Sequence, residues 1–505
     1  MSGFAPTDEQ LAALDAYRTG DDLVIEACAG AGKSSTLCLL AEATPSRRGQ
    51  YCAFNTAIVR DMGNAMPPQV RCSTVHSLAW RAIGHRFSHR LDSQRMRSSE
   101  LADLLGIEPI ALRTQAGQEK HLSAAYLASL VMRSVTHYCQ SADDEPGPEH
   151  VPYIDGIDTP ATDGRLTYWN NIQVREYLAP FMAAAWDDLS DPHGRLPYRH
   201  DAYLKMWSLS SPRINADVLF VDEAQDLSPV FIAIFDQQRH MQRVYVGDSQ
   251  QEIYSWMGAK NALGTLGETA RLATLSQSFR FGDAVAEVAN RILGCIPGAM
   301  QIRGTATIPS VVQTCSQPAA ILTRTNAAAV RTLLNAVRGG KRAHMVGGGE
   351  AVASFCRGAD ELQQLGSTQH FELACFSSWA EVQEYVREDA QGGELKLLVK
   401  LADDFGPRTI LFALKNMRRE QDADLVISTA HKSKGRAWPS VRLAEDFPNA
   451  EDAMPSIEEL RLLYVAVTRA RVELDIDEVV LPDEVEGEMG VEGDPAPMAL
   501  EGLPA

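Results

Sequence analysis

The chain has 505 residues, of which 45% are hydrophobic and 22% are charged, and these proportions are ordinary for globular proteins. Its length exceeds what one hydrophobic core supports, so we expect roughly three or four domains. No apolar run is long enough to span a bilayer, and the first residues lack the basic and apolar regions of a signal peptide. The nine cysteines form neither a C-x-x-C pair nor a metal-binding pattern with histidine, which predicts reduced thiols in a cytoplasm.

The acidic residues are unevenly distributed along the chain. The formal net charge is −19, yet residues 473–505 hold eleven acidic residues and no Lys or Arg, so this end carries −11 and the rest carries −8. Residues 478–505 are rich in Glu, Gly and Pro, which predicts a disordered acidic tail. The overall charge therefore does not exclude a nucleic-acid partner. The basic residues between Arg81 and Arg97, Arg90 among them, either face DNA phosphates or form a solvated helix face.

A glycine-rich loop follows the first apolar run. Residues 23–25 predict a buried strand, and residues 27–34 form a loop that ends in Lys-Ser. Such loops bring backbone N–H groups and a helix N-terminus to phosphate, while the Lys neutralises charge and the Ser hydroxyl binds Mg²⁺. We predict a nucleoside triphosphate site, although Ala27 replaces the first glycine of the usual pattern and an accidental glycine loop is the alternative. The predicted site residues are Ala29, Gly30, Ala31, Gly32, Lys33 and Ser34, with Ser34 also a Mg²⁺ ligand.

Two acidic residues end a second apolar run. Residues 218–221 predict a buried parallel strand, and Asp222 and Glu223 follow at its carboxyl end, where open α/β sheets bind their ligands. We predict that Asp222 holds Mg²⁺ and that Glu223 orients or deprotonates the attacking water. The alternative is a solvated acidic turn at a strand end.

Residues 244–259 distinguish this chain from other proteins with a phosphate loop. The segment begins as a strand, turns at a Gly-Asp pair, and continues with Gln251, Tyr254 and Trp256. It resembles the G-D-x-x-Q-x-I-Y-x-[WF]-R-G-A motif of UvrD/Rep-like superfamily 1A helicases. The resemblance implies that Gln251 couples the γ-phosphate to the DNA site and that both aromatics stack on bases of a single strand; two core aromatics in a turn are the alternative. Met257 replaces the family's usual Arg, which implies that one contact is missing.

Further family motifs occur in the family's order across nearly the whole chain. By resemblance, the nucleotide is contacted by Gln10, Phe279 and Gly435; catalytic arginines are Arg280 and Arg469; and DNA is contacted by Phe54, Asn55, Thr74, His76, Thr429 and His431. Alternatives remain for three of these residues. Gln10 could belong to a capped helix start at Thr7, and Thr74 and His76 could hold their loop instead of contacting phosphates.

Two stretches place the chain more closely within the family. Residues 196–207 and 431–438 resemble the F-box DNA helicases and their bacterial and phage relatives. An F-box would have to precede Phe4, so we expect the helicase core without that adaptor.

The order of the motifs predicts an α/β fold with two RecA-like parallel-sheet P-loop motor domains and helical insertions. The expected parts are motor domain 1A at residues 1–85 and 205–281, a mostly helical insertion 1B at 86–204, motor domain 2A at 282–345 and 424–477, a small insertion 2B at 346–423, and the tail at 478–505.

These resemblances imply an ATP- and Mg²⁺-dependent DNA helicase or translocase that moves 3′ to 5′ on single strands in replication, recombination or repair. Expected partners are single-stranded DNA, 3′-tailed duplex DNA and recombinase or replication proteins, and we expect a monomer in the cytoplasm of a bacterium or phage-infected cell. The alternative is a DNA-stimulated ATPase that strips or remodels proteins on DNA with little unwinding. A nucleotide-gated binding module without turnover is disfavoured because Glu223, Arg280 and Arg469 are all present.

One departure from the family concerns the ribose. Family members usually carry Glu two residues after the Lys-Gly of the T-x-H-x-x-K-G motif, where it accepts hydrogen bonds from the ribose hydroxyls, and this chain has Ala437. A methyl group cannot accept a hydrogen bond, so we expect weak discrimination between ATP and dATP. The alternative is that Ala437 marks an impaired motor.

Overall fold

A computed structural model shows two compact units within the chain. Unit 1 comprises Met1–Phe279 and Ala353–Leu411, and unit 2 comprises Arg280–Val352 and Phe412–Ala505. The structure describes residues 5–53, 56–91, 96–113, 119–154, 171–253, 263–264, 269–368, 370, 372–373, 376, 378–388, 394–448 and 455–481. The predictions for Phe54, Asn55, Tyr254, Trp256, Met257 and most of the acidic tail lie outside these residues.

Unit 1 is built on a six-stranded parallel sheet. Its strands are β1 (Leu23–Ala27), β2 (Gly49–Ala53), β3 (Val70–Thr74), β6 (Val218–Val221), β7 (Gln242–Gly247) and β8 (Arg271–Leu275). They lie in the order β3-β2-β6-β7-β1-β8, and every neighbouring pair is parallel. β2 and β6 are buried along their whole length, as expected where both faces of a sheet are covered. Because the strands share one direction, the carboxyl ends of β1, β6 and β7 meet at one edge of the sheet.

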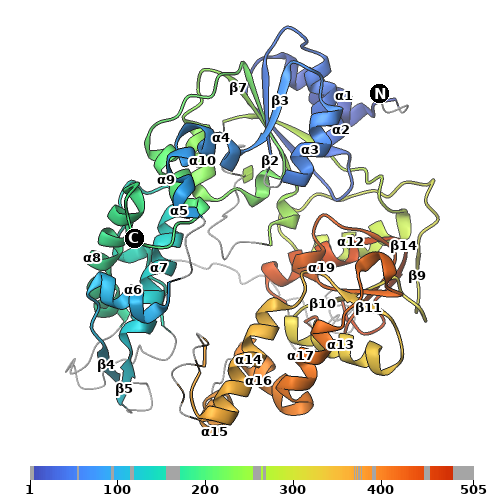
Figure 1. Cartoon of the computed structure of the whole chain (residues 1–505). Coiled ribbons are helices and arrows are strands. Elements are labelled where there is room, and N and C mark those ends of the chain that lie inside the picture. The colour runs from blue at the N-terminus through green and yellow to red at the C-terminus, as the bar shows by residue number, and fades with distance from the viewer. Residues whose placement is uncertain are drawn as a thin grey trace, which may run out of the picture. The chain divides into compact units, whose positions relative to one another are not determined.

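Helices surround this sheet and form a long insertion between β3 and β6. Figure 1 shows α1 (Asp8–Arg18), α2 (Lys33–Glu42) and α3 (Thr56–Ala65) together beside the sheet. The other elements are α4 (Val75–Ala82), η1 (Gly84–Phe87), α5 (Ser88–Leu91), α6 (Ser98–Leu105), the antiparallel hairpin β4 (Ile110–Arg113) and β5 (Glu119–Leu122), α7 (Ala124–Gln140), η2 (Pro148–His150), α8 (Asn171–Ser190), α9 (His200–Leu209), η3 (Ala224–Asp226), α10 (Pro229–Asp236) and η4 (Ser249–Gln251).

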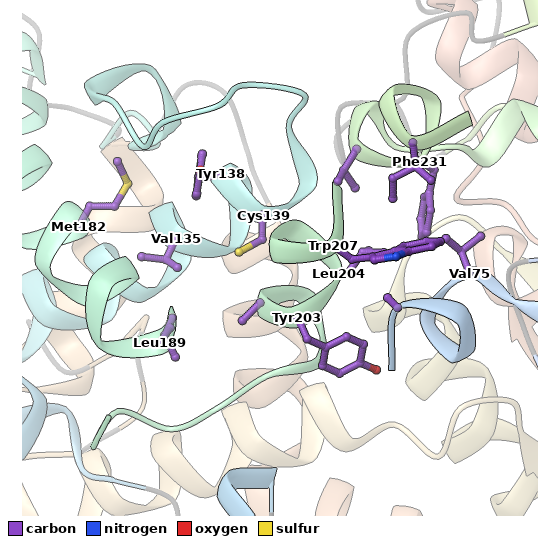
Figure 2. Packing of buried hydrophobic residues seen from close by; sticks show 14 of the residues in the cluster. Val75, Val135, Tyr138, Cys139, Met182, Leu189, Tyr203, Leu204, Trp207 and Phe231 are labelled. Atoms are coloured by element: carbon purple, nitrogen blue, oxygen red, sulfur yellow. The ribbon is translucent and has the colours of Figure 1, made fainter. Parts of the chain in front are cut away.

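Helix α9 joins the inserted helices to the sheet. Its side chains Tyr203, Leu204 and Trp207 belong to one continuous apolar core that includes residues of α7, α8, α4 and α10. Figure 2 shows these three side chains between Cys139 of α7 and Phe231 of α10. The inserted helices and the sheet therefore share a single core. The predicted boundary between residues 204 and 205 falls inside α9, and the predicted domain limits remain predictions.

A buried arginine holds the loop that leads into α9. The Arg90 guanidinium donates to the backbone carbonyls of Asp188 at 2.9 Å, Asp191 at 2.5 Å and Leu196 at 2.9 Å. The ring of Phe87 stacks on that of Tyr198, with centroids 4.9 Å apart. Arg90, whose role the sequence left open, thus fixes this loop and does not face solvent.

Unit 2 holds a second six-stranded parallel sheet, which confirms the predicted fold class. Its strands are β9 (Val311–Val312), β10 (Ala320–Thr323), β11 (Ala343–Met345), β12 (Leu425–Thr429), β13 (Trp438–Leu443) and β14 (Ala470–Asp475), in the order β11-β12-β10-β13-β14-β9. Its other elements are α12 (Asp283–Gly294), α13 (Asn326–Arg338), η6 (Glu420–Asp422), α18 (Ala430–Ser433) and α19 (Ile457–Val467). Between β11 and β12 the chain forms α14 (Glu350–Leu365), α15 (Trp379–Glu388), α16 (Glu394–Phe405) and α17 (Pro407–Lys415), of which residues 353–411 belong to unit 1.

The described residues bear on two expectations from the sequence, which concern membrane-spanning segments and disulfide bonds. None of their helices is both long and apolar enough to cross a membrane. Among the cysteines that the structure describes, none forms a disulfide.

The shared core predicts the effect of a substitution in α9. We expect Leu204→Ala to lower the free energy of unfolding by about 2–5 kcal/mol, because it leaves a cavity where the insertion meets the sheet. Leu209 is 38% exposed on the same helix, so Leu209→Ala is the matched control and should cost less than about 0.5 kcal/mol. Urea unfolding of both variants checks this, and equal stability would show that α9 is not a packing centre.

Candidate functional site

The phosphate loop lies between β1 and α2, as predicted. Gly30 and Gly32 have φ values of +78° and +80°, in the left-handed region that glycine adopts without steric cost, and Gly32 caps the N-terminus of α2. A Cβ at Gly32 would lie 3.5 Å from the Gln10 amide and 3.8 Å from the Phe279 ring. The Phe279 N–H also donates to the Gly30 carbonyl at 2.9 Å. Three predicted nucleotide contacts therefore meet beside the start of α2.

Gln10 also belongs to a helix cap. Its N–H donates to the Thr7 hydroxyl at 3.2 Å, and its side-chain carbonyl accepts from the Thr7 N–H at 3.1 Å. Its amide nitrogen donates to the Thr36 hydroxyl at 3.0 Å. The capped helix start that was the alternative is thus present, and adenine recognition by Gln10 remains a prediction.

The two acidic residues after β6 face the lysine of the phosphate loop. The Lys33 ammonium lies 2.9 Å from a carboxylate oxygen of Glu223. The Tyr51 hydroxyl donates to Asp222 at 2.8 Å, and the other Asp222 oxygen accepts from the Glu223 N–H at 2.9 Å. Glu223 has φ +54°, a left-handed conformation that is strained for a residue with a side chain. The sheet brings these groups together because β6 and β1 are separated only by β7.

The charges in this site are not balanced. Burial and then the neighbouring charge of Glu223 raise the pKa of Asp222 to about 6. Burial works against the charged form of Lys33, but the carboxylates of Glu223, Asp248 and Asp222 together raise the Lys33 pKa above its ordinary value. Carboxylate and hydroxyl oxygens are the ligands that Mg²⁺ prefers, with phosphate and water completing its shell. Asp222 and Ser34 therefore fit a Mg²⁺ ion bound with a triphosphate.

Gln225, which the sequence analysis did not single out, connects this carboxylate to the loop after β7. Its amide nitrogen donates to Glu223 at 2.7 Å, and its carbonyl oxygen accepts from the Asp248 N–H at 3.0 Å. The carboxylate of Asp248 accepts from the Gln251 amide at 2.5 Å. A Cβ at Gly247 would lie 2.4 Å from the Gln225 side chain, so this position needs glycine. A continuous path of hydrogen bonds thus runs from Glu223 to the predicted phosphate-sensing Gln251.

Two predicted DNA contacts of unit 1 that the structure describes, Thr74 and His76, hold their loop. The Thr74 hydroxyl caps α4 by accepting from the Ser77 N–H at 3.1 Å. The His76 ring packs edge-on against Tyr203 and Phe231, with centroids 6.1 and 5.9 Å apart. Its Nε2 lies 3.7 Å from a carboxylate oxygen of Asp201. Contact of Thr74 or His76 with DNA remains a prediction.

The remaining predicted residues belong to unit 2. Thr429 caps α18 through the Lys432 N–H at 3.3 Å, and Gly435 has φ +80° in an exposed turn. His431 is half-buried within α18. The two predicted catalytic arginines, Arg280 and Arg469, both donate hydrogen bonds to Thr468.

Arg280 and Arg469 differ in burial, since Arg280 is half-buried and Arg469 is fully buried. A guanidinium nitrogen of Arg280 donates to the Thr468 carbonyl at 3.3 Å. Arg469 is fully buried and donates to the Val465 carbonyl at 2.8 Å, the Thr468 hydroxyl at 3.0 Å and the Arg436 carbonyl at 3.3 Å. In this conformation the Arg469 guanidinium bonds to groups of its own unit.

A parallel sheet with a glycine phosphate loop after one strand and an Asp-Glu pair with a buried Asp after another defines a P-loop ATPase. A family model described as an AAA domain matches residues 10–257, which implies ATP binding, and one described as the UvrD-like helicase C-terminal domain matches residues 424–475. The chain belongs to the UvrD-like superfamily 1 helicases, as the motifs predicted.

Similar proteins support the closer placement. The F-box DNA helicase protein 1 of Schizosaccharomyces pombe is 28% identical over 511 residues, which cover 91% of this chain and 56% of that protein. The F-box DNA helicase 1 of Gallus gallus is 27% identical over 506 residues, 90% of this chain and 47% of that protein. DNA helicase IV of Escherichia coli is 26% identical over 269 residues, 50% of this chain and 32% of that protein. The chain spans about half the length of the two F-box helicases it matches, and the relationship is distant.

The path through Gln225 predicts a stability effect. We expect Gln225→Leu to lower the free energy of unfolding by about 1–3 kcal/mol, because the buried N–H of Asp248 loses its acceptor. Gln237 is exposed at the end of α10, so Gln237→Leu is the control and should change little. Urea unfolding compares the two, and equal midpoints would mean that the Gln225 contacts contribute nothing net.

Proposed function

We propose that this chain is an ATP- and Mg²⁺-dependent DNA helicase or translocase that moves 3′ to 5′ along single-stranded DNA. The observation that carries the proposal is the hydrogen-bonded path from Lys33 and Glu223 through Gln225 to Gln251. The same loop continues toward Tyr254 and Trp256, the residues proposed to stack on DNA bases. Family membership and the similarity to DNA helicases support DNA as the substrate.

The chemistry proposed for unit 1 follows from its contacts. The Lys33 ammonium, now paired with Glu223, would bind the outer phosphates when a triphosphate enters the loop. The Glu223 carboxylate would then be released from Lys33 and hydrogen-bond to the attacking water. Asp222 and Ser34 would hold Mg²⁺, which neutralises phosphate charge when bound. Gln10 and Phe279 would hold the base beside Gly32.

The residues proposed for unit 2 supply charge and DNA contacts. We assign Arg280 and Arg469 to the transferring phosphoryl group, where an arginine finger contributes about 10³–10⁵ in rate. Because Arg469 is fully buried, its guanidinium would have to exchange the carbonyls it now contacts for phosphate oxygens during the cycle. Thr429 and His431 are proposed to contact the strand, as Phe54, Asn55, Thr74 and His76 are in unit 1.

A second function is favoured by the small insertion between β11 and β12, whose described residues form four α-helices and the short helix η6. The chain would then be a DNA-stimulated ATPase that strips recombinase or other proteins from DNA as a monomer and unwinds little. Strand separation should be measured on 3′-tailed and 5′-tailed duplexes, beside displacement of a recombinase filament. Separation of the 3′-tailed duplex alone supports the helicase, filament displacement without separation supports the second function, and preference for the 5′ tail would overturn the polarity.

The role of Glu223 predicts a separation of binding from turnover. We expect Glu223→Gln to bind ATP and DNA nearly as the wild type does, while DNA-stimulated hydrolysis falls by about 10²–10⁴-fold, because the amide cannot take up a proton. Glu42→Gln, at an exposed position of α2, is the matched control and should hydrolyse normally. Near-normal hydrolysis by Glu223→Gln would reject the assignment.

Ala437 predicts unusual nucleotide selectivity. We expect similar KM values for ATP and dATP in the wild type, and a KM for ATP lower by about tenfold in Ala437→Glu, since a hydrogen bond to a charged group is worth about 1.5–3 kcal/mol. Steady-state kinetics with both nucleotides on both proteins checks this. A strong wild-type preference for ATP that Ala437→Glu leaves unchanged contradicts the ribose argument, whereas a gain in kcat would indicate an impaired motor.

A further inference from the structure

A carboxylate lies inside the sheet, on the strand that leads into the phosphate loop. Glu26 is the fourth residue of β1 and pairs in register with Gly247 of β7 and Thr274 of β8. Glu26 itself is half-buried, and its neighbours on β1, Ile25 and Ala27, are fully buried. Acidic side chains are rare at such positions unless they are paired or hydrogen-bonded. The partner of Glu26 is therefore informative.

That partner is the loop that follows β7. One carboxylate oxygen of Glu26 accepts a hydrogen bond from the Ser249 N–H at 2.7 Å. Ser249 begins η4, which ends at Gln251. The loop is thus attached twice: Gln225 bonds to the N–H of Asp248 from the side of Glu223, and Glu26 bonds to the next N–H from the side of the phosphate loop.

The charges around Glu26 are those of the nucleotide site. Burial, followed by the charge of Asp248, raises the pKa of Glu26 to about 7, while the Ser249 hydrogen bonds and the charge of Lys33 oppose the rise. Its partner on β8, Thr274, is uncharged. Glu26 is accordingly ionised above neutral pH, when it is the stronger acceptor, and it becomes protonated as the pH falls through about 7.

We propose that Glu26 is a positioning residue that fixes the loop of Gln251 against the phosphate-loop strand, so that DNA binding and ATP hydrolysis are coupled only while this attachment holds. This inference rests on the proposed function. It concerns a residue outside the predicted nucleotide and DNA contacts, and it assigns the coupling to two attachments of one loop instead of to Gln251 alone.

The ionised Glu26 carboxylate is proposed to support coupling, but its ionisation lowers the stability of the fold. A carboxyl group whose pKa is raised by folding destabilises the fold once the pH exceeds its unfolded pKa of about 4.3, and this cost is complete above the folded pKa. Replacing Glu26 removes that cost at pH 8. A purely structural residue would instead lower the melting temperature when replaced.

The test uses Glu26→Leu, which removes the acceptor, and Glu26→Gln, which keeps an oxygen acceptor without charge. Asp22→Asn is the matched control, because Asp22 accepts from the Arg243 N–H at 2.7 Å at the opposite end of the same two strands. Melting temperature, basal ATPase rate and ATPase rate with poly(dT) are measured from pH 6 to pH 8.5. Exchange of the Ser249 amide is followed by hydrogen–deuterium exchange of the full chain.

At pH 8 we expect Glu26→Leu to reduce the ratio of DNA-stimulated to basal kcat by about tenfold, with KM for ATP changed less than about threefold and no loss of melting temperature. The wild-type ratio should fall as the pH decreases through about 7, and Glu26→Gln should retain most stimulation at pH 8 without that pH dependence. Asp22→Asn should lower the melting temperature and leave the ratio unchanged.

The inference is overturned if Glu26→Leu has the same ratio of DNA-stimulated to basal kcat as the wild type. It is also overturned if that ratio falls only in proportion to a lower melting temperature. Absence of DNA stimulation in the wild type overturns the proposed function instead. The attachment itself is then still decided by amide exchange: faster exchange at Ser249 in Glu26→Leu supports it, and unchanged exchange refutes it.

Discussion

The carboxylate of Glu223 is shared by two donors, and the site depends on how it is shared. Lys33 reaches it from the phosphate loop and Gln225 from the turn after β6, at 2.9 and 2.7 Å. Two adjacent carboxylates face one ammonium group, so these three side chains together carry an excess of negative charge. A bound cation and a triphosphate would redistribute these partners. A change in the partners of Glu223 would also affect the loop of Gln251, because Gln225 bonds to both Glu223 and the Asp248 N–H.

Several predicted recognition residues are also the caps of helices that begin where strands end. Thr74 caps α4 after β3, Thr429 caps α18 after β12, and Gln10 completes the capping box of α1. A cap fixes the orientation of a short polar side chain and satisfies a backbone N–H that would otherwise lack a partner. The same residues can therefore be ordered before any ligand arrives. Recognition and local folding are not alternatives at these positions.

The sequence was sufficient for prediction where the residues of a motif are adjacent in the chain. Glycines before Lys33 and the acidic pair after residues 218–221 predicted the class of fold, which the two parallel sheets confirm, and two halves of a nucleotide site, which the structure brings together at Lys33 and Glu223. It did not reveal Gln225, Glu26 or the role of Arg90. Each of these acts on residues far away in the chain, such as Ser249 for Glu26 and Leu196 for Arg90, and such contacts exist only once the strands and the insertion have packed. The residues next to a single glutamine or glutamate do not predict which distant group it will hydrogen-bond to.

The left-handed backbone of Glu223 affects which substitutions evolution can accept at this position. Only glycine, and to a lesser degree asparagine or aspartate, adopts φ near +54° at little cost, and none of these places a carboxylate at the same reach. Replacement by glycine would relax the turn while removing the carboxylate that we propose activates water. Replacement by glycine would therefore lower backbone strain at the cost of the proposed turnover, and only selection for turnover would keep a glutamate in this conformation.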